Sequence, residues 1–467
     1  MEITDINKSV YIETMGCQMN KLDSELIAGD LATKGYRLVD DADAAGIIIY
    51  NTCSVRQHAE DKVISKLGQL ARKHKEQKDL VIAVVGCMAQ RMGQELLDDY
   101  RQVDVVCGPG QLHRLGEMIE QAQHQRRRQV VLNDPAEIEG LEQMDMAHEA
   151  HLPGSSFMAY LRVMRGCNNY CSYCVVPYVR GPEYSRPIGN IVTEAQRLVA
   201  NGIKEITLLG QTVNSYNYQE SGHTYGLADV LHKLHDIEGL QRLRFVTNYP
   251  RDFDQRILEA MADLPRVCEY LHIPAQSGSD RILKAMNRRY TAREYLELIE
   301  RARQIVPGIA FSGDFIVGFT DEDEQDFAAT KELMRKVRYK NCFIFKYSVR
   351  PGTRAEQKLK DNIPEEVKRR RNTELLELQN EISLVDNQKF IGEKVEILVA
   401  GPSKKPHLNQ RESETSGQEM QLAGRTKGDH IVVFNGTVDL IGNIIPVKIE
   451  KVSALTLFAN YQVSERI

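Results

Sequence analysis

Three cysteines lie close together in the run CNNYCSYC, at Cys167, Cys171 and Cys174. Their spacing, CxxxCxxC, allows one short loop to aim three thiolates at a single point. A structural zinc site takes four closed ligands, and ferredoxin-type cubanes are also held by four cysteines. A cubane held by only three cysteines keeps one iron open for another ligand. The spacing therefore predicts an open iron–sulfur cluster, and a partial zinc site or a group of reduced thiols is the plainer alternative.

Three other cysteines each follow an apolar segment that is typical of a strand. Cys17 comes after VYIET, Cys53 after GIIIY and Cys87 after LVIAVV. The carboxyl ends of strands in an open parallel sheet face the same crevice, where ligands bind. We therefore expect these three thiols to converge on a second cluster that also keeps one site open. The alternative is three unrelated buried thiols, because free cysteine is among the most buried residue types.

The remaining three cysteines are expected to be structural. Cys107 ends the run VDVVC, which reads as strand interior without a loop to present the thiol, so we do not count it as a fourth ligand. Cys268 and Cys342 are expected to be core residues inside apolar strands.

The elements that position the cysteines form two series. From Ser9 to about residue 150, continuous apolar strands alternate with helical patterns, which predicts a doubly wound parallel sheet. From about residue 155 to 360, six further strands predict a partial barrel with its active site at the carboxyl ends of the strands. These strands are expected over residues 160–164, 205–209, 242–247, 270–273, 311–315 and 341–346. Polar side chains at or near the strand ends are candidate ligands of a cofactor or substrate: Gln211, Asn214, His272, Gln276, Ser277, Asp314 and Arg350.

The C-terminal part begins with a long helix, expected over residues 364–390, and then changes to short strands. Runs such as KVEILVA, QLAGRT and IVVF, separated by Gly and Asn turns, predict a small barrel. Barrels of this size often hold single-stranded or loop RNA. Arg425, Lys427 and Phe434 are candidate RNA contacts, although surface charges and one core phenylalanine would explain the same residues.

Composition limits the class of protein. Of the 467 residues, 42% are hydrophobic and 27% are charged, which is ordinary for a soluble globular protein of two or three domains. No apolar run is long enough to span a membrane, and the N-terminus lacks the layout of a signal peptide. Nine cysteines without a secretory signal favour reduced thiols or metal ligands in the cytoplasm over disulfides. The net charge of -5 implies that any RNA contact comes from a local basic patch.

Over nearly the whole chain, the residues around these cysteines resemble a known family. CxxxCxxC is the motif of the radical S-adenosylmethionine (SAM) enzymes, and Tyr173 matches the aromatic residue that they commonly place before the third cysteine. GCQMN around Cys17 and VVPYVRGPEYSRP over residues 175–187 resemble the MiaB-type methylthiotransferases. The segments GQTVNSY, HIPAQSGSDRILKAMNR, DFIVGF and YSVRPGT agree with that family. Two segments depart from it, because GFTDED stands where the family usually reads GFPGET, and TNYP where it reads TSHP.

The resemblance implies an α/β protein of three domains. A methylthiotransferase domain with a doubly wound sheet is expected over residues 8–150, a radical SAM domain with a partial (β/α)6 TIM-like barrel over 153–387, and a TRAM domain with a small β-barrel over 388–460. The implied cofactors are SAM and two [4Fe-4S] clusters. The CxxxCxxC cysteines would hold the cluster that binds SAM at its open iron, and the three strand-end cysteines would hold an auxiliary cluster.

The implied reaction transfers a methylthio group to carbon 2 of an N(6)-isopentenylated adenosine beside the anticodon of tRNA. Cleavage of SAM gives a 5'-deoxyadenosyl radical that removes the hydrogen from the base, and the auxiliary cluster presents a sulfur that a second SAM has methylated. The target base must leave the anticodon-loop stack to be reached. No residue is expected to act as a general acid or base. An electron donor such as a flavodoxin is implied, with no membrane partner, and a monomer is expected.

The same residues distinguish this function from several others. The sister enzymes acting on threonylcarbamoyladenosine in tRNA typically read GCKVN, and those acting on an aspartate of a ribosomal protein read GCPKN, whereas this chain reads GCQMN. An iron–sulfur carrier would need neither an open iron nor a C-terminal RNA-binding barrel. An RNA-binding module with structural zinc would give no brown chromophore when reconstituted with iron and sulfide.

Overall fold

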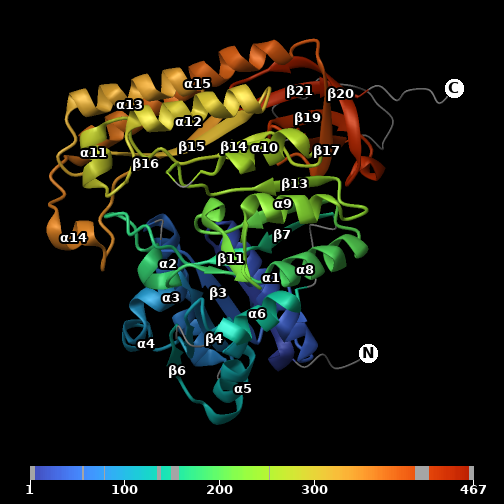
Figure 1. Ribbon diagram of the computed structural model, residues 1–467. Helices are drawn as coiled ribbons and strands as arrows, with labels where there is room; N and C mark the ends of the chain where they lie inside the picture. The colour runs from blue at the N-terminus through green and yellow to red at the C-terminus, as the bar shows by residue number, and fades with distance from the viewer. Residues whose placement is uncertain are drawn as a thin grey trace. The chain divides into compact units, whose positions relative to one another are not determined.

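The computed structural model of the chain describes residues 6–54, 57–77, 79–133, 138–148, 157–251, 253–404 and 420–461 (Figure 1). The chain divides into two compact units. The first comprises Met1–Gly226, Ile237–Gly239 and Ser348–Leu359, and the second comprises Leu227–Asp236, Leu240–Tyr347 and Lys360–Ile467. This division falls inside the segment 153–387, so the expected domain bounds stay a prediction. The expected junction at residues 150–153 lies outside the described residues.

The first unit begins with a sheet of six parallel strands. The strands are β1 (Ser9–Met15), β2 (Arg37–Leu38), β3 (Ile47–Thr52), β4 (Val81–Gly86), β5 (Val105–Cys107) and β6 (Gln129–Val131). The helices are α1 (Gln18–Thr33), α2 (Gln57–Glu76), α3 (Cys87–Met92), α4 (Gln94–Asp99), α5 (Leu115–Gln125) and α6 (Ile138–Met146). All six strands pair in parallel, in the order β2-β1-β3-β4-β5-β6.

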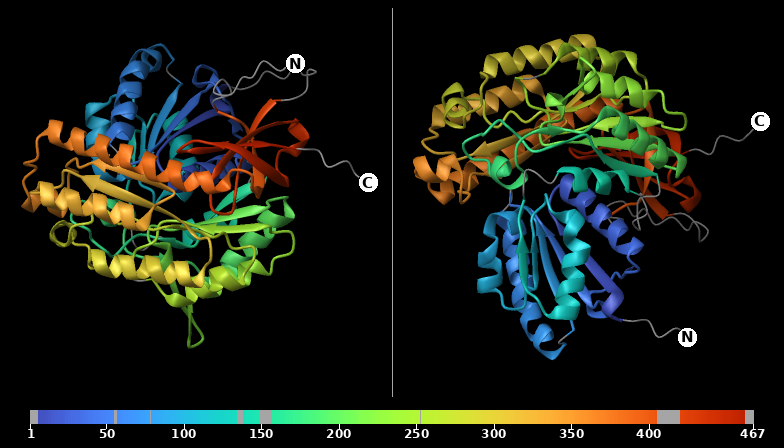
Figure 2. Two further views of the ribbon diagram at one scale, coloured as in Figure 1. Left: turned by 90° about the horizontal axis from the view of Figure 1, so that it is seen from above. Right: turned by 60° about the horizontal axis from the view of Figure 1, so that its bottom comes forward.

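This sheet has the doubly wound architecture that the sequence predicts. Strands β3 and β4 are buried along their whole length, as expected for central strands covered on both faces. Figure 2 (right) shows helices on both faces of the blue-to-cyan sheet. The strand order changes direction between β1 and β3, so the crevice beyond their carboxyl ends is the topological switch point at which such sheets bind ligands.

The rest of the first unit carries the CxxxCxxC loop. Strand β7 (Met158–Arg162) pairs in parallel with β10 (Glu205–Leu209). The strand expected over 160–164 is split, because β8 (Met164–Arg165) pairs antiparallel with β9 (Tyr184–Ser185). The remaining elements are α7 (Val176–Arg180), α8 (Ile188–Ala200), the hairpin β11 (Asn217–Glu220) and β12 (His223–Gly226), and α14 (Arg354–Lys358).

The second unit contains β13 (Arg242–Phe245) and a parallel sheet in the order β14-β15-β16 (Tyr270–His272, Ala310–Val317, Asn341–Lys346). These four strands agree with those expected from the sequence. Figure 1 shows α12 (Ala292–Ile305), α13 (Glu324–Val337) and α15 (Glu365–Asn387) side by side. The shorter helices are α9 (Leu227–His235), α10 (Gln255–Asp263) and α11 (Asp280–Ala285).

Of the two cysteines expected inside strands, only one lies in a strand. Cys342 is part of β16. Cys268 is buried but follows the isolated bridge at Val267 and precedes β14, so it belongs to no strand.

A closed five-stranded barrel ends the second unit, in the order β17-β18-β19-β21-β20. Its strands are β17 (Lys394–Pro402), β18 (Met420–Arg425), β19 (Ile431–Gly436), β20 (Ile444–Val452) and β21 (Thr456–Asn460), which confirms the predicted small barrel. Two buried side chains of β13 donate hydrogen bonds to its backbone: Arg242 to the carbonyl of Arg425 at 2.6 Å, and Arg244 to that of Thr426 at 2.7 Å.

In the described part of the chain, no helix is long and apolar enough to cross a membrane.

Candidate functional site

The three strand-end cysteines lie at one edge of the first sheet. Cys17 is the N-cap residue of α1, Cys53 follows the last residue of β3, and Cys87 is the first residue of α3, directly after β4. Because β1, β3 and β4 are neighbours in the sheet, all three cysteines lie at its carboxyl edge, where β1 and β3 flank the switch point. The Cys17 thiol donates a hydrogen bond to Oδ1 of Asn20 at 3.4 Å. The sequence prediction that these residues share one edge is therefore confirmed.

The environment of Cys17 favours its thiolate. The hydrogen bond with Cys53 lowers the pKa of Cys17 to about 6, in opposition to burial, and the charge of Arg180 and the backbone of Asn20 act in the same direction. The N-terminus of a helix is a position that stabilises a thiolate. Iron–sulfur ligands bind as thiolates, so the position of Cys17 suits a cluster ligand.

Cys87 lies in a more crowded place. Burial raises the pKa of its thiol, and Arg180 counteracts this by donating a hydrogen bond from Nε to Cys87 Sγ at 3.2 Å. The preceding Gly86 has a φ of 93°, and a Cβ there would lie 2.6 Å from the carbonyl oxygen of Thr52. Only glycine fits this turn, which aims Cys87 at the strand end.

The CxxxCxxC loop connects β8 to α7. Cys167 and Cys171 are buried and Cys174 is half-buried. The loop is anchored by hydrogen bonds from Cys167 N to the carbonyl of Gly181 at 3.1 Å and from Cys174 N to that of Cys171 at 3.0 Å. Gly166, at a φ of 71°, has no room for a Cβ, which would lie 1.8 Å from Pro182 O. The two chain segments therefore approach closely beside the first cysteine.

The donor set fits two iron–sulfur clusters. All nine cysteines are free thiols, and the six candidates are buried or half-buried. Among the described residues, no group of three or more Cys, His, Asp or Glu side chains converges so as to hold a single metal ion. A cubane binds each cysteine through a different iron and does not require such convergence.

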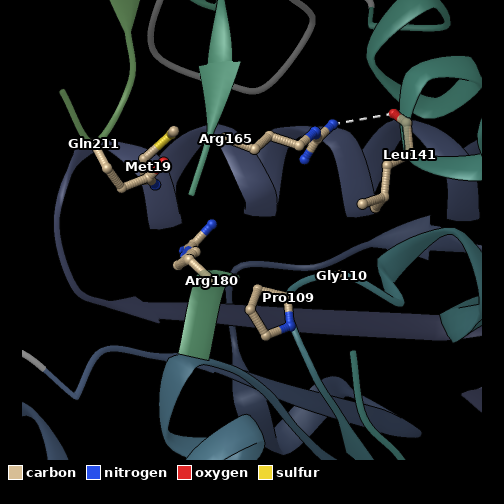
Figure 3. A pocket seen from close by; sticks show the side chains of 7 residues that line it. All are labelled: Met19, Pro109, Gly110, Leu141, Arg165, Arg180 and Gln211. Carbon is tan, nitrogen blue, oxygen red and sulfur yellow. Dashed lines mark hydrogen bonds between the residues drawn. The ribbon is translucent and has the colours of Figure 1, made fainter. Parts of the chain in front are cut away.

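A small pocket of about 30 Å³ lies within the first unit (Figure 3). It is lined by Met19, Pro109, Gly110, Leu141, Arg165, Arg180 and Gln211. Met19 is two residues from Cys17, and Arg165 is two residues from Cys167. Figure 3 shows Arg165 extended toward Leu141, whose carbonyl oxygen accepts its hydrogen bond at 3.1 Å. The pocket therefore lies between residues that neighbour the two proposed cluster sites.

Arg180 belongs to a buried network of ion pairs. Its Nη2 donates to Asp23 of α1 at 2.8 Å, and Asp23 also accepts from Arg162 of β7. Arg162 donates in turn to Asp145 of α6 at 3.0 Å, and Asp145 accepts a further hydrogen bond from Arg165. The side chains of Arg162 and Asp23 are each 1% exposed. These pairs fix α1, whose N-cap residue is Cys17, to β7 and α7 on either side of the CxxxCxxC loop.

The same buried region should make stability depend on pH. The side chain of His148 is 0% exposed and lies 3.1 Å from a carboxylate oxygen of Glu194 and 3.5 Å from one of Glu25. Burial opposes its charged form, but the two carboxylates raise the pKa from 6.5 to about 9. A raised pKa contributes stability that is present in full below the unfolded value and is lost as pH rises toward the folded value.

We therefore expect the free energy of unfolding to fall by up to roughly 3 kcal/mol between pH 6.5 and about 9. Chemical denaturation across this range measures the fall. His148→Gln should flatten the pH dependence, whereas the exposed His232→Gln should leave it intact. An unchanged slope in His148→Gln would contradict the assignment.

The first unit also holds four of the predicted cofactor ligands. Cys167 Sγ lies 3.5 Å from Oγ1 of Thr212, which places the neighbouring Gln211 beside the loop. Gln211 Oε1 is buried and accepts no hydrogen bond from the described residues. Arg350 is buried and donates to Gln57 of α2 at 2.5 Å, which places it on the side of the strand-end cysteines. Two further candidates lie close to these residues in the chain. Half-buried Tyr173 directly precedes Cys174, and buried Asn214 is two residues from Thr212.

The other four predicted ligands lie in the second unit. His272, at the end of β14, has Nε2 3.4 Å from Oδ2 of Asp314 in β15. The backbone N of Gln276 donates to the carbonyl of Asp314 at 2.8 Å, and Gln276 has a φ of 71°. Ser277 is buried, 3.4 Å from Oγ1 of Thr330. His272, Gln276 and Asp314 are thus brought together, and their role as SAM ligands stays a prediction.

Of the three predicted RNA contacts, Phe434 needs correction. Phe434 is 2% exposed and lies in the core of the barrel, so it cannot stack on a base, and its prediction as an RNA contact is wrong. Lys427 donates to the carbonyl of Pro265 at 2.6 Å, and Arg425 pairs with Asp429 at 2.8 Å. Both cations are engaged within the second unit, although Arg425 keeps 43% of its side chain exposed.

Sequence reasoning missed three residues near the cysteines. Arg180 lies inside the segment VVPYVRGPEYSRP, but no rule of sequence spacing pairs it with Cys87. Tyr170 and Tyr178 are 45% and 49% exposed, and their rings meet edge to face with centroids 6.0 Å apart. Tyr170 also has a φ of 46°, which is uncommon for a bulky residue. The only sequence signal was the presence of two tyrosines in the motifs around the CxxxCxxC loop.

Comparison with sequence families gives three consecutive matches. Residues 9–108 match the family described as "Uncharacterized protein family UPF0004", residues 161–334 match the radical SAM superfamily, and residues 412–461 match the TRAM domain. These matches follow the order of the three expected domains.

Solved structures share the fold. TsrM from Kitasatospora setae, a radical SAM methyltransferase, superposes with a TM-score of 0.51 at 15% identity, covering 72% of this chain and 73% of that one. OxsB, a cobalamin-dependent SAM radical enzyme, gives a TM-score of 0.51 at 12% identity, covering 79% and 56%. At these identities the likeness shows the fold alone.

Relatives that match over the full length are much closer in sequence. A protein of Rhodopirellula baltica is 44% identical, covering 98% of this chain and 97% of the relative. One of Carboxydothermus hydrogenoformans is 44% identical, covering 95% and 96%. Both carry the same name, and on this similarity the chain belongs to the family of the tRNA-2-methylthio-N(6)-dimethylallyladenosine synthases, within the radical SAM superfamily.

Proposed function

We propose that this protein transfers a methylthio group to carbon 2 of N(6)-isopentenyladenosine beside the anticodon of tRNA. The observation that carries the proposal is the presence, in one compact unit, of two sets of three free cysteines and a small pocket. The names of the full-length relatives support the choice of reaction and substrate.

The two cysteine sets take separate roles in this proposal. Cys167, Cys171 and Cys174 would hold a [4Fe-4S] cluster with an open iron for SAM, and the strand-end set of Cys17, Cys53 and Cys87 would hold the auxiliary cluster. When bound, these groups supply a radical able to take hydrogen from an unactivated carbon, and the sulfur that replaces it.

The chain itself supplies the surroundings of that chemistry. Gln211 offers a buried carboxamide oxygen that accepts no hydrogen bond from the described residues. Arg180 offers a buried cation at the pocket wall. Burial of the cysteines limits access of water to reactive species, which suppresses side reactions.

The partners are part of the same proposal. TRAM-domain membership supports tRNA as the partner. We further propose an external one-electron donor such as a flavodoxin, a monomeric state, and a cytoplasmic location, to which the nine free thiols are suited.

The direct test offers three substrates to the anaerobically reconstituted full-length protein with SAM and a reductant. These are an anticodon stem-loop with isopentenyladenosine, one with threonylcarbamoyladenosine, and a ribosomal protein with its target aspartate. Mass spectrometry of nucleosides and peptides should find the methylthio group only in the first. Modification of either other substrate, with the first unmodified, would contradict the proposed substrate.

The exposed tyrosine pair should contribute to RNA binding. Unpaired bases of RNA loops stack on aromatic side chains, and each stacked base is worth about 1–3 kcal/mol. Tyr178→Ala is therefore expected to weaken binding of the isopentenylated stem-loop by about that amount. Fluorescence anisotropy with a labelled stem-loop gives the dissociation constant. Tyr178→Phe, which keeps the ring, should bind like the unchanged protein, and an unaltered constant in Tyr178→Ala would refute stacking.

A further inference from the structure

One buried cation comes from the segment after the CxxxCxxC loop and contacts the strand-end cysteines. Arg180 is the last residue of α7, a helix that begins two residues after Cys174. Its guanidinium nevertheless contacts the other set, since Nε donates to Cys87 Sγ at 3.2 Å. Val175, which directly precedes α7, and Val179, which lies within α7, both pack against Cys87. The segment that follows the CxxxCxxC loop therefore forms part of the wall around the strand-end cysteines.

The orientation of Arg180 is fixed from its other side. Nη2 donates to Asp23 at 2.8 Å, and only 7% of the Arg180 side chain is exposed. Asp23 also accepts from the buried Arg162. Because a guanidinium presents its donors in a rigid fork, the bond to Asp23 directs Nε at the sulfur.

We propose that Arg180 is a positioning residue that holds Cys87 and raises the reduction potential of the cluster bound by the strand-end set. The inference rests on the proposed function, because it assumes that these cysteines bind a cluster. Reduction adds negative charge, which a fixed guanidinium stabilises. Hydrogen bonds to ligand sulfurs and the net charge around a cluster are among the factors that set its potential. Burial strengthens the effect because little water screens the cation.

The test uses a full-length background in which Cys167, Cys171 and Cys174 are replaced by alanine, so that only the strand-end set can hold a cluster. Iron and sulfide are counted after reconstitution, and the cluster is titrated electrochemically by EPR. The ratio of reduced to oxidised cluster is compared at the potential where this background is half reduced. There Arg180→Gln should lower the ratio at least tenfold, which corresponds to a fall in the reduction potential of about 59 mV for one electron. Arg180→Lys, which keeps the charge but not the fork, should shift the ratio in the same direction by less.

Arg165 provides a matched control. It lines the same pocket, but its guanidinium donates to Asp145 and to the carbonyl of Leu141. Arg165→Gln should therefore shift the potential much less than Arg180→Gln, and an equal shift there would show that any pocket cation suffices and would overturn the role of Arg180.

The remaining outcomes separate the inference from the proposed function. If the triple-alanine background binds no iron, the proposal of an auxiliary cluster is contradicted, and the inference about Arg180 is contradicted with it. If iron is bound and Arg180→Gln keeps the original potential, only the inference is overturned. Should Arg180→Gln not fold, the result for Arg180→Lys decides, and an unchanged potential there overturns the inference.

Discussion

Replacing Cys17 by alanine is expected to abolish methylthiolation of the isopentenylated stem-loop while cleavage of SAM continues. Cys17 belongs to the strand-end set, and its removal leaves the three cysteines of the CxxxCxxC loop intact. The variant should therefore still form 5'-deoxyadenosine under reducing conditions, whereas the methylthio nucleoside falls to background. Both products are measured by mass spectrometry in the same anaerobic reaction. This split between the two products is the result that distinguishes two clusters from one.

Cys107→Ala is the control for this experiment. Cys107 ends β5 in the same sheet, but burial raises the pKa of its thiol to about 12, and it belongs to neither cysteine set. Its replacement should leave both products unchanged. Loss of the methylthio nucleoside in Cys107→Ala would make it a member of the strand-end set, and retention of that product in Cys17→Ala would remove Cys17 from the set.

The position of the strand-end set could be predicted because it follows from local patterns. Apolar runs mark β1, β3 and β4, and a parallel sheet necessarily brings their carboxyl ends to one edge. The strands over 205–209 and 341–346 were likewise predicted to the residue, since each is an uninterrupted run between turns. The order in which the strands pair could not be predicted, because it depends on contacts between distant segments.

What the sequence did not reveal depends on tertiary contacts. Arg180 and Cys87 lie far apart in the chain, and only the packing of α7 against α3 brings them together. Phe434 was misread because an alternating strand exposes every second side chain, whereas β19 buries Val432, Val433 and Phe434 in succession inside a closed barrel. Lys427 stays a prediction as an RNA contact, and its hydrogen bond to the carbonyl of Pro265 could not be predicted because that partner is a backbone group that no motif marks.

Asp145→Asn should strongly destabilise the first unit. Burial alone would raise the pKa of Asp145, but the charges of Arg162 and Arg165 lower it, so the carboxylate is ionised in the folded protein. It is 1% exposed and accepts hydrogen bonds from both arginines. Asparagine keeps the shape but removes the charge, which leaves two buried cations undercompensated. Breaking a buried ion pair from one side costs about 3–5 kcal/mol.

Hydrogen exchange measures this loss locally, as a fall in the free energy of opening for the amides of β7 and α6. The matched control is Glu76→Gln, which removes the charge from an ion pair of similar geometry, 2.9 Å from Arg72, at 62% exposure. Exposed pairs contribute only about 0.3–0.5 kcal/mol on a helix, so protection of β7 should not change. Equal protection in Asp145→Asn and Glu76→Gln would mean that hydrogen bonding, rather than charge, holds α1, β7 and α7 around the cysteines. A loss confined to Asp145→Asn would mean that the charge of this carboxylate keeps Arg162, and through it Asp23 and Arg180, in the arrangement that reaches Cys87.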